Sequence, residues 1–286
     1  MAALGLSLAV TDAYGLFGYP VAHSWSPFIH GMFARQTQQD LSYRLYESPP
    51  ERFRSDVLEF FSAGGRGVNV TVPHKHAAAD LVNELTPRAQ LADAVNTIIL
   101  DGQNLVGDNT DGVGLVADLR RNLGLRWTEP RILLLGAGGA ARGVIGPLLE
   151  LNPRVLVIAN RTVARADQLV REFAPLGPVS GCAFGELQAE HYDLIVNATS
   201  ASLRGEVPAI PASVVDALTT CYDMSYGTTE TPFTNWGRVH GAERSVQGWG
   251  MLVEQAAEAF GLWRGVRPDT APVLEALRSR MHTDHA

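Results

Sequence analysis

Lysine, long hydrophobic runs and clustered positive charge are scarce in this sequence. Only one of the 23 basic residues is a lysine, Lys75, and the net charge at pH 7 is −7. No basic run reaches five residues, so this balance argues against a surface that binds nucleic acid or an anionic membrane. No apolar run approaches the length of about 18 residues that a membrane-spanning helix needs.

Cysteine is almost absent as well. Cys182 and Cys221 lie far apart, each beside an apolar segment typical of a strand. This pattern predicts two buried free thiols in a protein of the reducing cytoplasm, and no disulfide. No histidine or cysteine spacing matches a metal site, so we expect no metal. The first residues lack the basic start and the cleavage pattern of a signal peptide.

The length and composition predict two globular domains. The chain has 286 residues, of which 46% are hydrophobic and 19% charged. A single core usually stops growing below this size, so two domains of roughly 100 to 170 residues each are expected. Short apolar runs alternate with amphipathic segments of helix length, which predicts an α/β fold with parallel sheets.

The first half of the chain predicts one α/β unit. We expect strands at 13–18, 41–46, 67–72 and 94–100, and helices at 26–35 and 50–61. This unit ends near Asp108. The final helices, from Gly248 onward, are expected to pack back on it. The first domain is therefore predicted to comprise residues 1–109 with 248–286.

A second unit, residues 110–247, has the pattern of a doubly wound Rossmann domain. After a helix at 112–122, the run 131–135 is apolar on both faces, as a central parallel strand must be. Further strands are expected at 155–159, 194–197 and 220–224. The two joints between the units, 108–112 and 245–248, are candidate hinges.

The sequence GAGGAA follows the apolar run, at residues 136–141. Gly136 permits a tight turn, Gly138 lets the backbone approach phosphate, and Ala140 with Ala141 keeps the next helix close to the strand. The free N–H groups of that helix would then point at a pyrophosphate. Glycines also serve ordinary strand-to-helix turns, so the prediction rests on the preceding strand. Pro147 can kink the helix.

The second strand of this unit ends without an acidic residue. Asn160, Arg161 and Thr162 stand where an acid would bind the ribose hydroxyl of NAD, and Arg165 lies one turn further on. A guanidinium group pairs with the 2′-phosphate of NADP, a charge-assisted contact worth about 1.5 to 3 kcal/mol. The alternative, that both arginines merely belong to a solvated helix start, is disfavoured because cations oppose the helix dipole there.

Polar side chains suited to a polyol lie around Lys75. Asn69 and Thr71 precede it, and Asn96 and Asp111 follow. Amide, hydroxyl and ammonium groups can hold hydroxyls and move a proton, so together with the glycine turn they predict hydride transfer between NADP(H) and an alcohol or ketone. A lysine two residues after a proline ordinarily lies in a solvated loop, and Asn and Thr often bond turn backbone.

Nine blocks, in order, resemble the shikimate dehydrogenase family over nearly the whole chain. They are GYPVAHSWSP (18–27), GVNVTVPHKH (67–76), ADAVNT (92–97), GDNTDG (107–112), GAGGAARG (136–143), ANRT (159–162), VNATS (196–200), DMSYGTTETPF (223–233) and GWGMLVEQAAEAF (248–260). The resemblance implies NADPH-dependent, reversible reduction of 3-dehydroshikimate to shikimate, in aromatic amino-acid biosynthesis.

The resemblance also implies the roles of single residues. Lys75 and Asp111 would be the catalytic acid–base pair, and Ser24 and Ser26 would hold the substrate carboxylate. The other implied substrate ligands are Asn69, Thr71, Asn96, Tyr226 and Gln255. The implied NADP ligands are Gly136, Ala137, Gly138, Gly139, Ala140, Asn160, Arg161, Thr162, Arg165, Thr199 and Gly248. His23 and His74 are weaker candidates, because the family assigns them no chemistry.

Three positions depart from the family pattern. Asp93 and Ser202 replace glycines, and Gln247 stands where aspartate often precedes Gly248. Asp93 can keep the loop conformation, because Asp tolerates left-handed backbone. Ser202 and Gln247 adjoin the nicotinamide side of the expected site, so their effect on affinity is open.

Three other functions compete with this one. A quinate/shikimate dehydrogenase using NAD is the nearest, although Ser26 and Arg161 favour shikimate and NADP. A non-catalytic NADP-sensing regulator would need no proton donor, and a methylene-folate-type dehydrogenase would not use paired serines. The expected partners are small molecules only, with the protein a cytoplasmic monomer or homodimer and no nucleic acid or membrane as partner.

Overall fold

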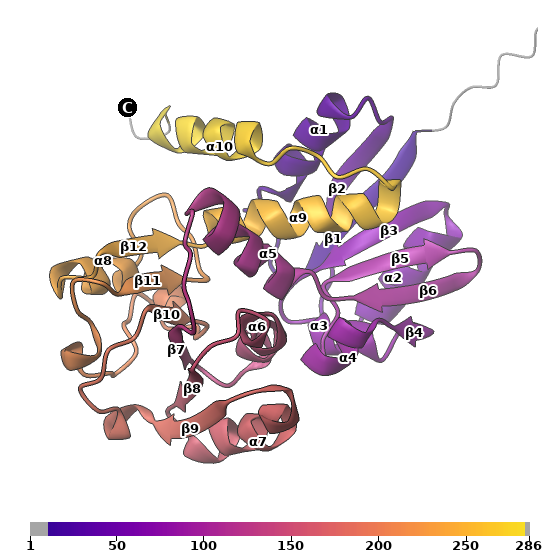
Figure 1. Cartoon of the computed structure of the whole chain (residues 1–286). Coiled ribbons are helices and arrows are strands. Elements are labelled where there is room, and N and C mark those ends of the chain that lie inside the picture. Colours follow the sequence, from indigo (N-terminus) through magenta and orange to yellow (C-terminus); the bar gives the residue numbers. More distant parts are fainter. Residues whose placement is uncertain (1–10, 284–286) are drawn as a thin grey trace, which may run out of the picture.

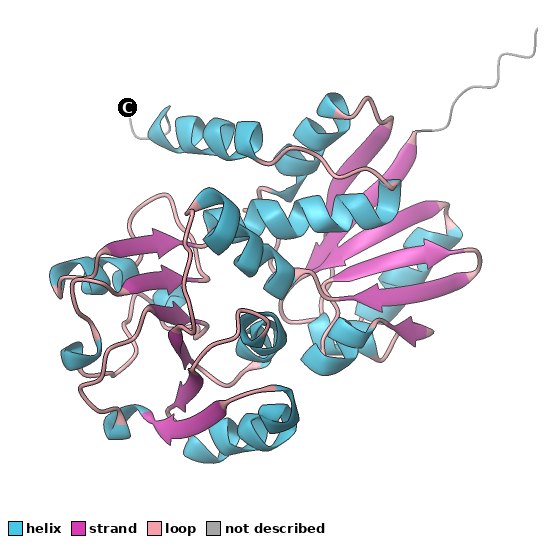
Figure 2. Cartoon of the chain, viewed as in Figure 1, coloured by secondary structure: helices cyan, strands magenta, loops and turns pink. Residues whose placement is uncertain are grey.

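The computed structural model describes residues 11–283 and contains two six-stranded sheets. Figures 1 and 2 show the sheets side by side, with helices where they meet. The helix α5 (Asp111–Ala117) contacts both α6 (Gly139–Leu149) and α9 (Trp249–Arg264). The prediction of an α/β fold with two sheet-based units is confirmed.

The first sheet is mixed, with strand order β2-β1-β3-β5-β6-β4. Its strands are β1 (Asp12–Gly18), β2 (Leu41–Glu47), β3 (Gly65–Val70), β4 (Glu84–Leu85), β5 (Thr97–Asp101) and β6 (Asn104–Asp108). β1 runs parallel to β2 and β3, but β5 is antiparallel to both β3 and β6. The prediction of a parallel sheet is wrong here, because Gly102 and Gln103 alone connect β5 to β6 and allow only a hairpin.

Helices from both ends of the chain cover the first sheet. The chain forms α1 (Ser26–Gln36), α2 (Phe53–Ser62), α3 (Lys75–Ala79), α4 (Pro87–Ala92) and, near its end, α10 (Ala271–Thr283). α1, α9 and α10 share one buried cluster that includes Ile29, Phe33, Val253, Phe260 and Leu277. The C-terminal helices therefore pack on the N-terminal sheet, as predicted.

The second sheet is parallel throughout, with order β12-β11-β10-β7-β8-β9. Its strands are β7 (Arg131–Leu135), β8 (Val155–Asn160), β9 (Val179–Ala183), β10 (Leu194–Asn197), β11 (Thr220–Asp223) and β12 (Arg244–Gln247). This is the doubly wound dinucleotide-binding order, in which the ligand crevice lies at the carboxyl ends of the adjacent strands β7 and β10, where the strand order reverses. The two edge strands, β9 and β12, were not predicted, because their sequences are less apolar than those of the central strands.

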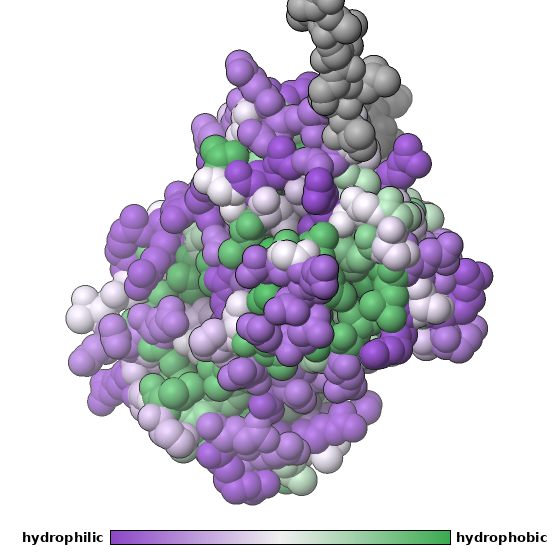
Figure 3. Space-filling view, turned by 90° about the vertical axis from the view of Figure 1, so that its right-hand side faces the viewer, coloured by the Kyte–Doolittle hydropathy of each residue, from purple (hydrophilic) through white to green (hydrophobic). Residues whose placement is uncertain are grey.

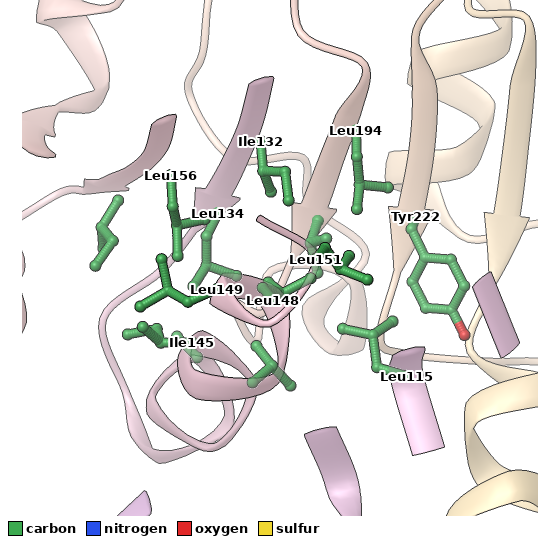
Figure 4. Close-up of a cluster of buried hydrophobic side chains, with 14 of the residues drawn as sticks. Leu115, Ile132, Leu134, Ile145, Leu148, Leu149, Leu151, Leu156, Leu194 and Tyr222 are labelled. Carbon is green, nitrogen blue, oxygen red and sulfur yellow. The ribbon is translucent and has the colours of Figure 1, made fainter. Parts of the chain in front are cut away.

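The central strand β7 is buried on both faces, as predicted. Ile132 and Leu134 pack into the cluster that also contains α6 residues, shown in Figure 4. Leu133 and Leu135 belong to the cluster on the opposite face. β7 is therefore a rigid support for the turn that follows it.

One helix differs from prediction, and another tolerates its proline as expected. The helix expected at 112–122 is α5 followed by a π-helical turn, Asp118–Asn122. The buried Asp118 carboxylate, at the start of this turn, accepts hydrogen bonds from Tyr222 Oη (2.6 Å) and Asn122 Nδ2 (2.9 Å). Pro147 lies inside α6 without ending it.

The remaining helices of the second unit are α7 (Val163–Phe173) and α8 (Pro232–Val239). Within residues 11–283, no helix is both long and apolar enough to cross a membrane. Figure 3 shows one face of the molecule, where hydrophilic residues surround hydrophobic patches, as on ordinary globular surfaces.

Candidate active site

A cleft of about 590 Å³ lies between residues of the two sheets. Its walls contain all the predicted substrate ligands, namely Ser24, Ser26, Asn69, Thr71, Lys75, Asn96, Asp111, Tyr226 and Gln255. Ala140, Thr199 and Gly248 line the same cleft. The structure thus gathers groups that lie more than 200 positions apart in the sequence.

Lys75 and Asp111 form an ion pair in the cleft wall. Each begins a helix, α3 and α5 respectively, and Lys75 Nζ lies 2.5 Å from Asp111 Oδ2. The other carboxylate oxygen accepts a hydrogen bond from Asn96 Nδ2 at 2.8 Å. With 25% of the lysine and 12% of the aspartate side chain exposed, the pair is fixed yet reachable from the cleft.

Asn96 is the centre of a buried polar network. Its Oδ1 accepts from the Thr110 amide at 2.9 Å and from Thr97 Oγ1 at 2.9 Å. Its Nδ2 also lies 3.4 Å from Gln255 Oε1, which brings α9 into the network. Gln255 is therefore held within the site instead of projecting into solvent.

Asn69 is held by a tyrosine that no sequence motif indicated. Tyr43 Oη donates to Asn69 Oδ1 at 2.8 Å, and Asn69 Nδ2 donates to the Asn96 carbonyl at 3.2 Å. Burial raises the pKa of Tyr43, so its hydroxyl stays a neutral donor. Tyr43 lies on β2 without a distinctive neighbour, so only the fold brings it to the site.

Two serines lie at the start of α1. Ser24 Oγ and Ser26 Oγ are 3.1 Å apart, and the Ser26 amide donates to Ser24 Oγ at 3.2 Å. The residue in the capping position is Trp25, so neither serine is a simple helix cap. Two adjacent hydroxyls and a helix start suit a carboxylate.

The opposite wall belongs to the second sheet. Tyr226 packs against Trp249 with ring centroids 4.5 Å apart, and burial raises the pKa of Tyr226. Thr199 Oγ1 donates to Asn197 Oδ1 at 2.7 Å. A Cβ at Gly248 would lie 2.4 Å from the Met224 carbonyl oxygen, so only glycine allows this approach.

The glycine turn fits a pyrophosphate. Gly136 has φ +107°, and its amide donates to the Ala159 carbonyl at 2.8 Å. A Cβ at Gly138 would meet no atom within 4 Å, so the turn is open on that side. α6 begins at Gly139, and the N–H groups of a first helical turn have no intrahelical acceptors. A phosphate can accept them.

The predicted packing role of Ala140 is wrong. Ala141 is fully buried beside the strand, whereas Ala140 is exposed and lines the cleft. Successive positions at a helix start point in different directions, so only one of the two can face the sheet.

The predicted cations lie at the end of the neighbouring strand. Asn160 ends β8, and its Nδ2 donates to the Thr162 carbonyl at 2.9 Å. Arg161, Thr162 and Arg165 are exposed. Among the described residues, neither arginine side chain has a hydrogen-bond or ion-pair partner in this structure, so both guanidinium groups are available to an anion.

The two histidines have different places. His74 is buried, with Nε2 2.7 Å from the Ser48 carbonyl and its ring stacked on Phe53, which is a structural role. His23 lies in the cleft wall. Asp93 ends α4 in the left-handed region with φ +50°, as expected for a residue that replaces glycine.

Three family models match successive parts of this chain. Residues 16–98 match the model of the shikimate dehydrogenase substrate binding domain, residues 118–205 that of shikimate/quinate 5-dehydrogenase, and residues 248–278 that of the shikimate 5′-dehydrogenase C-terminal domain. A protein of Methylococcus capsulatus named shikimate dehydrogenase (NADP(+)) is 54% identical over 274 residues, 95% of this chain and 98% of the relative. The chain belongs to the shikimate dehydrogenase family.

Other family members agree in sequence and in structure. The shikimate dehydrogenase (NADP(+)) of Aeromonas hydrophila is 55% identical over 273 residues, 95% of this chain and 99% of the relative. A shikimate 5-dehydrogenase of Thermus thermophilus, solved with NADP(H) and shikimate, is 33% identical with a TM-score of 0.84, over 94% of this chain and 99% of that one. An Ael1 enzyme of Pseudomonas putida is 43% identical with a TM-score of 0.88, over 93% and 98%.

Proposed function

We propose that this protein is an NADP-dependent shikimate dehydrogenase, which reversibly reduces 3-dehydroshikimate to shikimate in aromatic amino-acid biosynthesis. The observation that carries the proposal is the Lys75–Asp111 pair, 2.5 Å apart in a cleft that the dinucleotide turn also borders. The names of relatives at about half identity support the substrate and the cofactor.

Lys75 is the proton donor in this proposal. Bound NADPH supplies the hydride, and the ketone oxygen then needs a proton. An ammonium group within hydrogen-bond reach gives that proton, and the amine takes it back in the oxidative direction. Asp111 holds the ammonium in position by a charge-assisted bond and can accept the same substrate hydroxyl.

The other cleft residues bind and orient the substrate. Ser24 and Ser26 would donate to its carboxylate, while Tyr226 would contact it from the second domain. Asn69, Thr71, Asn96 and Gln255 would hold the ring hydroxyls. Since neighbours already hold the amide groups of Asn69, Asn96 and Gln255, these side chains need little ordering when substrate binds.

The second domain would hold NADP. The turn from Gly136 to Ala140, with Ala137, Gly138 and Gly139, would bind the pyrophosphate. Arg161 and Arg165, with Asn160 and Thr162, would bind the 2′-phosphate, and Thr199 and Gly248 would border the nicotinamide. We accordingly assign residues 110–247 to the NADP-binding domain, and 1–109 with 248–286 to the substrate-binding domain.

We expect a cytoplasmic monomer or homodimer with small-molecule partners only. Two free cysteines suit a reducing compartment, and burial raises the pKa of Cys221 to about 12, which keeps it a thiol.

A four-way assay tests the function. Oxidation of shikimate and of quinate would each be measured with NADP and with NAD, by nicotinamide absorbance. Fast turnover with shikimate and NADP alone is the expected result. A preference for quinate or NAD would favour the quinate/shikimate alternative, and no turnover with any pair would favour a non-catalytic sensor.

A further inference from the structure

Tyr226 lies in the loop that follows β11, and the backbone amides on both sides of it are held by side chains. The Ser225 N–H donates to Asp223 Oδ1 at 3.0 Å. The Gly227 N–H donates to Gln247 Oε1 at 2.7 Å. The backbone that carries Tyr226 is therefore held on both sides, and its ring packs against Trp249.

Gln247 makes a second contact with the same loop. Its Nε2 donates to the Thr229 carbonyl at 3.1 Å, while its Oε1 accepts from Gly227. A primary amide can accept from an N–H through its oxygen and donate to a carbonyl through its nitrogen at the same time. An aspartate here, which the family often carries, would lack the donor.

Asp223 anchors the other side of Tyr226. Its carboxylate is fully buried and has no cationic partner among the described residues. Besides Ser225, its donors are Asn197 Nδ2 (3.2 Å), Ser202 Oγ (2.5 Å) and Thr231 Oγ1 (2.8 Å). Hydrogen bonds replace the hydration that a buried carboxyl group loses, and here Ser202 supplies one that glycine could not.

We propose that Gln247, together with Asp223 and its donor Ser202, is a positioning residue that holds Tyr226 in the cleft. The proposal rests on the proposed function only for the identity of the substrate. Ser202 and Gln247, which both depart from the family pattern, would then share one role. Ser202 orients the carboxylate of Asp223, which precedes Tyr226, and Gln247 fixes the backbone at Gly227, which follows it.

Loss of the Gln247 contacts should affect substrate binding more than the chemical step. In Gln247→Ala we expect the KM for shikimate to rise about three- to tenfold, as one or two lost neutral hydrogen bonds would cause. The kcat and the dissociation constant of NADP should change by less than about twofold, because the contacts act in substrate binding. Gln247→Glu keeps the acceptor oxygen, so its KM for shikimate should lie between that of the wild type and that of Gln247→Ala.

A double-mutant cycle separates positioning from general structure. If Gln247 acts through Tyr226, the Gln247→Ala effect on KM should vanish in a Tyr226→Ala background. The control is Gln168→Ala, which removes an exposed glutamine bonded to Glu172 on α7 and should leave KM unchanged. Additive effects in the cycle, an unchanged KM in Gln247→Ala, or an equal rise in the control would overturn the proposal.

Amide hydrogen exchange tests the same contact without turnover. The Gly227 amide should exchange at least about tenfold faster in Gln247→Ala than in wild type, while β7 amides keep their rates. An unchanged Gly227 rate would overturn the proposal even if the enzyme is active. Absence of shikimate turnover in wild type would count against the function alone, because the exchange result stands independently.

Discussion

The ammonium group of Lys75 lies 2.5 Å from one Asp111 oxygen, while Asn96 donates to the other at 2.8 Å. Asp111 is therefore held from two sides before any substrate is present. Such prior fixation lowers the cost of aligning a proton donor with a ketone oxygen. The ammonium group of Lys75 is therefore the feature to test by mutation.

Lys75→Met removes the ammonium group but keeps most of the side-chain volume. We expect kcat to fall by about a hundredfold or more, as for other lost acid–base groups, with the NADP dissociation constant nearly unchanged. Steady-state kinetics and NADP titration would measure both. Arg66→Ala, an exposed change outside the cleft lining, is the control. Near-normal turnover in Lys75→Met would refute the assignment.

Arg161 should decide the choice between the two dinucleotides. Arg161→Ala removes the guanidinium group that we propose pairs with the 2′-phosphate, so the KM for NADP should rise about tenfold or more. The KM for NAD, which lacks that phosphate, should stay the same. Arg171→Ala in the last turn of α7 serves as the control. Equal changes for both cofactors would show that Arg161 has another role.

Among the elements, α5 and α9 are in unusually close contact. A Cβ at Gly114 would lie 2.7 Å from Gln255 Cβ, and one at Gly250 would lie 1.8 Å from Asp118 Oδ1. These glycines let α9 approach α5 and the π-helical turn after it closely enough for Gln255 to reach Asn96. The contact thus links the fold of α9 to the polar network of the cleft.

Gly250→Ala should destabilise the protein by about 1 to 3 kcal/mol, because the added methyl overlaps the Asp118 carboxylate. Thermal or urea unfolding would measure the change. Gly31→Ala is the matched control, since its Cβ would meet only an Arg35 atom at 3.7 Å. A helical Gly-to-Ala change of this kind should stabilise by up to about 1 kcal/mol. Equal effects in the two variants would contradict the overlap.

Local pattern was enough to predict some elements and not others. β7 is apolar at every position after Arg131 and was predictable as a central strand. β12 was not, because Arg244–Gln247 gains its place only by pairing with β11. The same holds in the site. Lys75 and Asp111 lie in distinctive strings, whereas Tyr43 lies in none and acts through a contact that exists only in the folded chain.

At the scale of the whole molecule, Asp108 joins three elements. Arg88 holds its carboxylate with two contacts of 2.6 Å and also reaches Glu258 on α9 at 3.1 Å. Burial alone would raise the pKa of Asp108, but the bonds from Arg88 and Thr86 outweigh it and lower the pKa. The ionised form therefore stabilises the native state.

Asp108→Asn should cost about 3 kcal/mol at pH 7, as breaking a buried ion pair does. Because the folded-state pKa is lowered, this stability is present above the unfolded pKa of about 4 and is lost as the pH falls through the folded value. Urea midpoints of both proteins should differ by a constant amount from pH 8 to 5 and converge below about pH 4. A difference between the two urea midpoints that grows as the pH falls would contradict a lowered pKa of Asp108 in the folded state.

Closure of the cleft is the expected large-scale motion. The joints 108–112 and 245–248 connect the two sheets, and substrate must be shielded from water during hydride transfer. The radius of gyration from X-ray scattering should fall when shikimate and NADP are both bound, relative to either ligand alone. Identical values in all states would argue against hinges at these joints.

The chain has one lysine, and that lysine lies in the cleft, a quarter exposed. Apart from the terminal amino group, the chain therefore presents a single primary amine to the medium. An amine-directed reaction such as reductive methylation would label Lys75 almost alone, and a ligand bound in the cleft would protect it. An isotopically labelled methyl group introduced in this way would serve as a spectroscopic probe of Lys75 without competing signals from other side chains.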